Sequence, residues 1–174
     1  YDLLLDMLPD QPSRVTVLPY FTPSGTPYFD VDVKGTILGL DLSVTKAELL
    51  KGLLEGIAME VRLNLEILRQ SGYQVNELRI IGGGSKSEKH VQLKADATGM
   101  PVTILDVTEA GCMGVAMLAK ACNDKADVKD IAREWVRPVK RIIPSRQDYY
   151  KDKFNRYKNL YPALKTVYKN IYLV

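Results

Sequence analysis

The chain has 174 residues, of which 46% are hydrophobic and 26% are charged, and its formal net charge is +3. This length fits one well-buried domain and is too short for two substantial ones. The composition excludes a disordered chain, and no apolar run reaches the roughly 18 residues that a membrane-spanning helix needs. We therefore expect a single domain over residues 1–174 with no membrane partner.

The basic residues, cysteines and histidine of the chain argue against nucleic-acid binding, a disulfide bond and a zinc site. A nucleic-acid-binding protein carries a denser basic stripe than the mildly basic C-terminus of this chain. Cys112 and Cys122 lie in one predicted helix, too far apart for a disulfide, and reduced thiols are typical of the cytoplasm. The thiols therefore lead us to expect a cytoplasmic protein. His90 has no CxxC or HxxxH spacing around it, so we expect no metal site.

The first forty residues predict short elements around a loop. Residues 1–14 predict one helical turn that prolines end, and an apolar run of β type follows from Val15 to Tyr20. Residues 21–35 are rich in proline and glycine and predict a loop or hairpin. Residues 36–40 predict a short strand.

A long helix is predicted to begin at Thr45. Thr45 and Glu48 match a capping box, in which hydroxyl and carboxylate each bind an unpaired backbone amide, and Ser71-Gly72 supplies a C-terminal stop. Its apolar stripe consists of Leu49, Leu53, Ile57, Val61, Leu65 and Leu68. Further apolar residues widen the stripe, so we expect packing on more than one side. Glu55, on the apolar face, is expected to pair with Arg62 or to cap a buried group.

The next part of the chain alternates strands and helices. Residues 77–82 predict a buried strand, and Ser85 with Glu88 matches a second capping box that begins a short helix. Residues 101–107 predict another strand, and Glu109 is expected to cap the helix that follows. That helix has a face of small residues that a neighbour could approach closely, formed by Gly111, Gly114, Ala116 and Ala119. This alternation is typical of an α/β fold.

The C-terminal part predicts a helix that docks on the domain, over residues 146–174. A short helix near 127–133 and an extended piece precede it, and Trp135 is expected to anchor this segment to the core. The aromatic stripe of the terminal helix consists of Tyr150, Phe154, Tyr157, Tyr161, Leu164, Tyr168 and Ile171. We interpret the stripe as a docking face rather than a base-stacking surface, and Pro162 predicts a kink or a break.

Three glycines, Gly82–Gly84, join a predicted strand to the next helix. A Walker loop requires glycine directly before the lysine, but Ser85 precedes Lys86, and a dinucleotide fingerprint requires glycine where Ser87 stands. A strand that delivers glycines to a helix start can still bind phosphate, because the first amides of a helix are unpaired. The residues alone support nucleotide binding and a plain tight turn about equally.

Several short motifs follow one another at regular places between residues 15 and 122. They are Leu54-Glu55-Gly56-Ile57-Ala58 with Arg62, the glycine triplet with Ser87, Gln92 and Asp96, Gly99-Met100-Pro101-Val102, and Glu109 with Gly114 and Ala116. In order and spacing they resemble the second domain of the FGGY carbohydrate kinases, a family that includes xylulose, glycerol, ribulose, gluconate and rhamnulose kinases. We expect the resemblance to continue to the end of the chain.

The resemblance implies an actin-like, ribonuclease-H-like domain with a mixed sheet flanked by helices. Such a domain is one of two that clamp ATP between them. If the roles of the family's residues apply to this chain, Gly83 and Gly84 would line the phosphates and ribose of the nucleotide. Gly82 would permit its close approach, and Ser87 would lie at the adenine base. Mg²⁺ would be held mainly by the phosphates and the other domain. This chain would supply no catalytic residue, because the family's catalytic aspartate belongs to the other domain.

The family's first domain, with its catalytic aspartate and most sugar contacts, is not among these residues. The resemblance therefore implies one half of a kinase that transfers the γ-phosphoryl group of ATP to a sugar or polyol, and a fragment inactive alone. Its partners would be ATP or ADP and, through the other domain, the sugar; a homodimer remains open. Residues 22–27 and Lys34 depart from the family pattern, which has a Gly-Glu-Arg-like stretch and commonly arginine there.

Two other functions fit parts of the sequence. A non-catalytic actin-like module that binds nucleotide or a partner is one, and a ribonuclease-H-like nuclease, which needs about three or four converging carboxylates, is the other. Asp30 and Asp32 could form a metal pair on one side of an extended strand, but we expect them to be solvated. His90 is expected to be a surface or packing residue rather than a catalyst.

Overall fold

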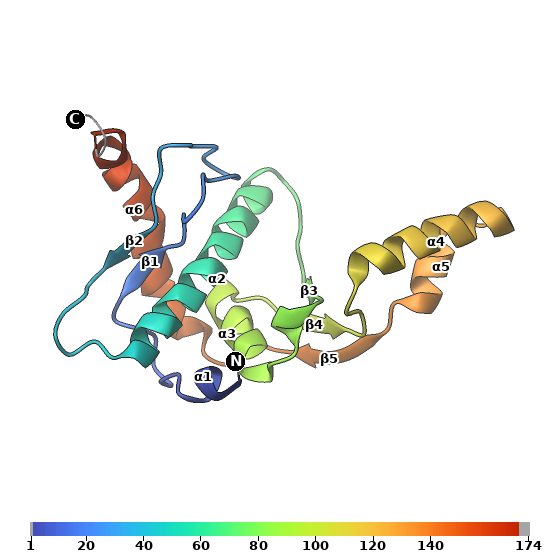
Figure 1. Ribbon diagram of the computed structural model, residues 1–174, viewed down its shortest axis with the longest axis horizontal. Coiled ribbons are helices and arrows are strands. Elements are labelled where there is room, and N and C mark those ends of the chain that lie inside the picture. The colour runs from blue at the N-terminus through green and yellow to red at the C-terminus, as the bar shows by residue number, and fades with distance from the viewer. Residues whose placement is uncertain (1, 171–174) are drawn as a thin grey trace.

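The computed structural model describes residues 2–170, which form two small sheets and several helices (Figure 1). The first sheet pairs β1 (Thr16–Leu18) with β2 (Thr36–Leu38) in antiparallel orientation. The second sheet has the order β3 (Leu78–Ile80), β4 (Val102–Leu105) and β5 (Pro138–Ile142). Because β3 and β4 are parallel while β4 and β5 are antiparallel, the predicted α/β class with a mixed sheet is confirmed.

The helices follow the predicted order along the chain. They are α1 (Asp2–Asp6), α2 (Lys46–Gln70), α3 (Glu88–Thr98), α4 (Ala110–Asp124), α5 (Val128–Trp135) and α6 (Lys151–Asn170), with 3-10 turns at Gly83–Ser85 and Gln147–Tyr150. Within residues 2–170, none of these helices is long and apolar enough to cross a membrane.

Local sequence signals set the ends of α2 and α3. The Thr45 hydroxyl accepts a hydrogen bond from the Glu48 amide at 3.2 Å, and the Glu48 carboxylate accepts one from the Thr45 amide at 3.0 Å. The predicted capping box is therefore present. Gly99 ends α3 in the left-handed conformation, with φ +68°, which glycine adopts without steric cost.

The start of α3 differs from the prediction. Its cap is Ser87, whose hydroxyl accepts a hydrogen bond from a first-turn amide, and the predicted cap Ser85 lies in the preceding 3-10 turn. The Ser85 hydroxyl donates instead to the carbonyl of Gly82 at 2.7 Å. The flexible glycines thus form a turn of their own, which moves the start of the helix by two residues.

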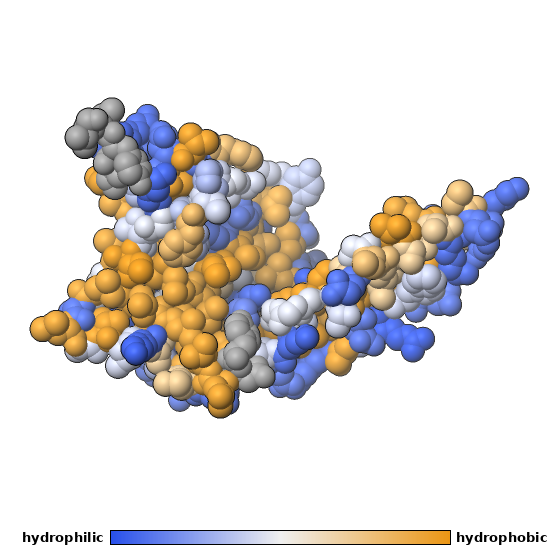
Figure 2. All heavy atoms as spheres, viewed as in Figure 1, coloured by the Kyte–Doolittle hydropathy of each residue, from blue (hydrophilic) through white to orange (hydrophobic). Residues whose placement is uncertain are grey.

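The larger hydrophobic core is built around α2, which packs against β1, α3 and α6. Gly56 permits a close approach, because a Cβ atom there would lie 2.4 Å from the carbonyl oxygen of Val17 in β1. Part of the predicted stripe is nevertheless exposed, including Ile57 and Val61. Figure 2 shows apolar residues gathered over this part of the molecule. A smaller core between α3 and the second sheet consists of Val91, Ala95, Val102 and Ile142.

The terminal helix α6 docks through its aromatic stripe. Phe154, Tyr157, Tyr161 and Tyr168 are buried, as is Tyr150 in the preceding 3-10 turn. Leu164 is partly buried against the same core, whereas Ile171 lies outside the described residues. Pro162 does not break α6, which is continuous from Lys151 to Asn170.

A buried ion pair joins α2 to α6. The Glu55 carboxylate pairs with the Lys153 ammonium, and these side chains are 0% and 6% exposed. Glu55 also accepts hydrogen bonds from the Ser13 amide and the Tyr150 hydroxyl. The expected capping of a buried group is therefore present, but the expected partner Arg62 is wrong. Arg62 lies about two helical turns further along α2, where it stacks over the ring of Phe154 and donates to a carbonyl of α3.

The loop before β2 contains Asp30 and Asp32, which the sequence placed on an extended strand. Asp30 and Asp32 lie in the loop rather than on a strand, and Asp30 accepts hydrogen bonds from the Asp32 amide and the Tyr161 hydroxyl. Asp30 therefore holds the loop against α6. Within residues 2–170, no group of three potential metal-ligating side chains converges, as a metal site or a metal-dependent nuclease would require.

The helices α4 and α5 pack on each other and project beyond one end of the second sheet (Figure 1). Trp135 lines a cavity together with Cys112 and Met113 of this arm and belongs to neither hydrophobic core, so the expectation that it anchors the segment to the core is wrong. No atom lies within 4 Å of a Cβ built on Gly111 or Gly114, so no neighbour among the described residues covers these glycines. Both cysteines are free thiols.

We expect Lys153→Met to lower the free energy of unfolding by about 3–5 kcal/mol, because it leaves the Glu55 carboxylate buried without a counter-ion. Urea unfolding measures this change. Lys158→Met is the matched control on the same helix: its ion pair with Glu66 is about one third exposed, so the loss should stay below about 1 kcal/mol. Equal effects of the two substitutions would contradict the importance of the buried pair.

Candidate functional site

The glycine turn, residues 82–87, lies at the carboxyl ends of the two parallel strands. Gly82 follows β3 directly after Ile81 and has φ +76°, a conformation that other residues rarely adopt. Its amide donates to the carbonyl of Val107, just beyond β4, at 3.2 Å. Ligands of α/β proteins commonly bind outside the carboxyl ends of parallel strands, so the turn occupies a favourable place for a binding site.

The turn presents its own backbone to the outside. Its internal hydrogen bonds use the amides of Ser85 and Lys86, which donate to the carbonyls of Gly82 and Gly83. The amides of Gly83 and Gly84 come first in the turn, where helical amides have no intrahelical acceptor. No atom lies within 4 Å of a Cβ built on Gly82 or Gly83. A ligand can therefore approach this backbone closely.

The last two side chains of the turn, those of Lys86 and Ser87, have different surroundings. The Ser87 hydroxyl accepts a weak hydrogen bond, 3.4 Å long, from the His90 amide, which leaves its proton available to a ligand. Lys86 is exposed. The four residues predicted to bind nucleotide, Gly82, Gly83, Gly84 and Ser87, thus lie in one short segment.

Two residues that sequence reasoning did not assign to this region lie beneath the turn. The Nζ atom of Lys94 is 3.4 Å from a Cβ built on Gly84, and Cε1 of His90 is 3.9 Å from it. Burial, with Lys94 as a second cause, lowers the pKa of His90 to about 4, and burial lowers the pKa of Lys94. Their four-residue spacing on one helix face was the available signal. His90 is buried, so its expected packing role is confirmed.

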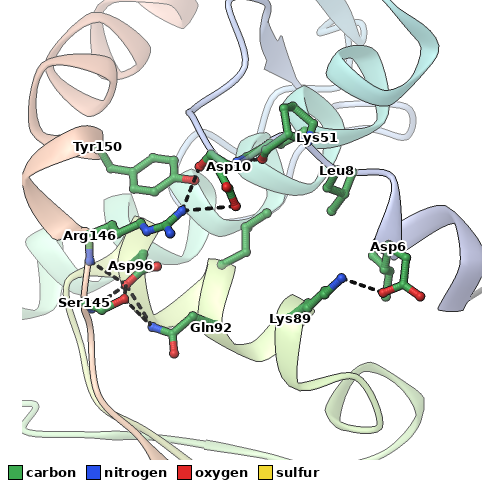
Figure 3. Close-up of a pocket in the computed structure, with 13 residues that line it drawn as sticks. Asp6, Leu8, Asp10, Lys51, Lys89, Gln92, Asp96, Ser145, Arg146 and Tyr150 are labelled. Atoms are coloured by element: carbon green, nitrogen blue, oxygen red, sulfur yellow. Dashed lines mark hydrogen bonds and ion pairs between the residues drawn. The ribbon is translucent and has the colours of Figure 1, made fainter.

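Asp96 fastens the segment before α6 to α3. Its carboxylate accepts hydrogen bonds from the amides of Ser145 and Arg146 at 2.6 and 3.0 Å, and from the Gln92 side chain at 3.0 Å (Figure 3). Asp96 and Gln92, which the motifs singled out, therefore have a structural role here. Glu109 begins α4, but its side chain makes no capping hydrogen bond, contrary to expectation.

A cavity of about 620 Å³ lies beside these residues, under the N-terminal segment (Figure 3). Its cations are already engaged: Lys89 pairs with Asp6, Arg146 pairs with Asp10, and Lys51 donates to two main-chain carbonyls of the same segment. These contacts hold the N-terminal segment on α2 and α3 and leave the cavity without excess charge.

Comparison with known proteins decides the family. Residues 2–121 match the C-terminal domain of the FGGY family of carbohydrate kinases. The chain belongs to this family. The match includes the glycine turn and every element from α1 to β4, together with most of α4.

Individual FGGY kinases resemble the chain over most of its length. It is 28% identical to the xylulose kinase of Bacillus subtilis over 95% of the chain and 35% of that protein. It is 37% identical to glycerol kinase 2 of Saccharolobus solfataricus over 75% of the chain and 26% of that protein. The crystal structure of xylulose kinase from Rhodospirillum rubrum superposes with a TM-score of 0.79 at 26% identity, over 97% of the chain and 34% of that protein.

A more distant structure shares the fold. Plasmodium falciparum glycerol kinase, whose structure contains ADP, superposes with a TM-score of 0.75 at 18% identity, over 93% of the chain and 33% of that protein. The chain thus spans about a third of the length of the FGGY kinases that it matches. These proteins contain a large part that has no counterpart among the present residues.

We expect His90 to make stability depend on pH. Its pKa is about 4 in the folded chain, against an ordinary value of 6.5. Between these values the unfolded chain takes up a proton that the folded chain does not, so the free energy of unfolding should decrease as pH falls from 6.5 to 4. Urea unfolding across this range measures the slope. In His90→Gln the slope should be shallower by up to about 1.4 kcal/mol per pH unit, and an unchanged slope would contradict the assignment.

Proposed function

We propose that this chain is the nucleotide-side domain of an ATP-dependent carbohydrate kinase. The observation that carries the proposal is the glycine turn at the carboxyl ends of β3 and β4, in a chain that belongs to the FGGY family. Glycerol kinase with ADP adds that a protein of this fold holds a nucleotide. We place the nucleotide against the glycine turn.

The residues of the turn suit a polyphosphate nucleotide. The amides of Gly83 and Gly84 would donate to phosphate or ribose oxygens, each contributing about 1 kcal/mol or less to a solvated group. The absence of atoms within 4 Å of Cβ positions at Gly82 and Gly83 leaves room for this approach. The Ser87 hydroxyl would donate a hydrogen bond to the adenine base of the nucleotide. Lys94 adds a positive charge beside Gly84, which favours an anionic ligand.

This domain positions the nucleotide and does not carry the catalytic base. Bound ATP would supply the γ-phosphoryl group, with Mg²⁺ on its phosphate oxygens, and the sugar or polyol hydroxyl would accept it. We assign the aspartate that removes the hydroxyl proton to the part of the protein outside this chain. The chain alone should therefore not phosphorylate a sugar. Xylulose and glycerol kinases both occur among its relatives, so the acceptor is a sugar or polyol.

Gly83→Val in the full-length protein should raise the KM for ATP by about tenfold or more, because the new side chain occupies the space of the nucleotide. The KM for the sugar should change by less than about twofold, since the substitution removes no sugar contact. Steady-state kinetics with each substrate varied in turn measures both constants.

Gly83 suits this experiment because its Cβ position is empty and its backbone does not require glycine, unlike Gly82 with φ +76°. Unfolding of the variant should match that of the wild type. Lys86→Ala, an exposed substitution in the same turn, is the control and should leave both KM values unchanged. An unchanged KM for ATP in Gly83→Val would sink the nucleotide assignment.

A further inference from the structure

A second cavity, of about 580 Å³, lies on the face of the second sheet that α3 does not cover. The other face packs against α3 through alternate residues such as Val102 and Ile142. The residues between them on each strand point to the opposite side and line this cavity together with α5. None of the lining residues belongs to the glycine turn.

Two arginines and a threonine stand in one row across this face. In the sheet register, Arg79 of β3 is paired with Thr103 of β4, and Thr103 is paired with Arg141 of β5. Glu77 precedes Arg79 by two residues, and its carboxylate reaches the row at 3.0 Å from Nε of Arg79 and 3.8 Å from Nε of Arg141. The Thr103 hydroxyl donates to the same carboxylate at 3.1 Å.

The charges in this row do not balance. Glu77 neutralises one guanidinium, and within residues 2–170 it is the only carboxylate paired with either Arg79 or Arg141. The closest contacts of the Glu77 carboxylate are with the Nε atoms of the two arginines. Each guanidinium carries two further nitrogens, which together have four donor hydrogens. Donor groups and one unit of positive charge are therefore left for a ligand. Arg133 on α5 also lines the cavity, but its charge is paired with Asp130 at 2.7 Å.

The remainder of the cavity is apolar. This part of the lining consists of Leu105, Ala132, Val136 and Pro138. A ligand that fills the cavity meets charged donors at one end and hydrocarbon at the other. Hydroxyl groups against the hydrocarbon end would lose hydrogen bonds to water, which disfavours a sugar phosphate at this place.

We propose that this cavity binds a small molecule in which one oxyanion group, a carboxylate or a phosphate, is joined to an apolar body. The oxyanion binds Arg79 and Arg141, whose planar guanidinium groups match the geometry of two oxygens on one acid group. The apolar body packs against Leu105 and Val136. This site is separate from the proposed nucleotide site and does not depend on it.

Binding is tested by calorimetric titration of the full-length protein with phenyl phosphate, benzoate and inorganic phosphate. Phenyl phosphate should bind about tenfold more tightly than inorganic phosphate, because burial of its ring adds apolar contact. Arg79→Gln and Arg141→Gln should each weaken the binding of phenyl phosphate about tenfold or more, since each removes a charged hydrogen-bond donor. A preference for benzoate would identify a carboxylate as the better group, and a preference for phenyl phosphate would identify a phosphate.

The matched control is Lys140→Gln. Lys140 is the neighbour of Arg141 on β5, carries the same charge and pairs with Glu88 on the α3 side. Its removal should change the affinity by less than about twofold, because it does not face the cavity. Val136→Ser should abolish the advantage of phenyl phosphate over inorganic phosphate and leave inorganic phosphate unchanged.

Three results would overturn the proposal. They are no saturable binding of either phenyl phosphate or benzoate, equal weakening by Lys140→Gln and Arg141→Gln, and no tighter binding of phenyl phosphate or benzoate than of inorganic phosphate in the wild type. Arg79 and Arg141 are well exposed, with side chains 66% and 58% accessible, so their substitutions should not disturb folding. A melting temperature equal to that of the wild type verifies this for each variant.

Discussion

The buried carboxylate of Glu55 is the constraint on which the arrangement of this chain depends. A charge inside a core is tolerated when it is paired and hydrogen-bonded, and Lys153, Ser13 and Tyr150 together meet that requirement. Lys153 also donates to the carbonyls of Ser13 and Val15. One network therefore joins the segment directly before β1, the central helix α2 and the terminal helix α6. Since α3 packs on α2 and begins at the glycine turn, the place of the turn depends on this network as well.

A second polar network explains the many tyrosines of α6. One oxygen of Glu60 accepts hydrogen bonds from the hydroxyls of Tyr20 and Tyr157, and Asp30 accepts one from Tyr161. The ring of Tyr161 also stacks on Tyr28, with ring centroids 3.6 Å apart. These hydroxyls and rings are used inside the molecule, which supports the interpretation of the stripe as a docking face. They also hold the loop of residues 21–35.

The second sheet carries the proposed nucleotide site and the arginine row in different ways. The glycine turn would act as a backbone site: the amides of Gly83 and Gly84 have no intrahelical acceptor because a 3-10 turn begins there, and no side chain blocks the approach of a ligand to Gly82 and Gly83. The arginine row is a side-chain site, created by strand register and by a single carboxylate between two guanidinium groups. A backbone site tolerates many surrounding sequences, whereas the row disappears if one arginine is replaced. The two sites can therefore change independently.

The sequence by itself determined the elements, the family and the candidate turn, because these depend on local signals. Capping residues, apolar periodicity and glycines act within a few positions of one another, so Thr45, Gly99 and the triplet Gly82–Gly84 could be interpreted without a fold. The partners of charged groups could not be predicted from the sequence. Glu55 was expected to pair with Arg62 on its own helix, but its partner Lys153 lies 98 residues away. The row of Arg79, Thr103 and Arg141 exists only through the pairing of three strands, and Lys94 reaches Gly84 only because α3 folds back beneath the turn. Such contacts follow from tertiary packing, which local sequence spacing does not encode.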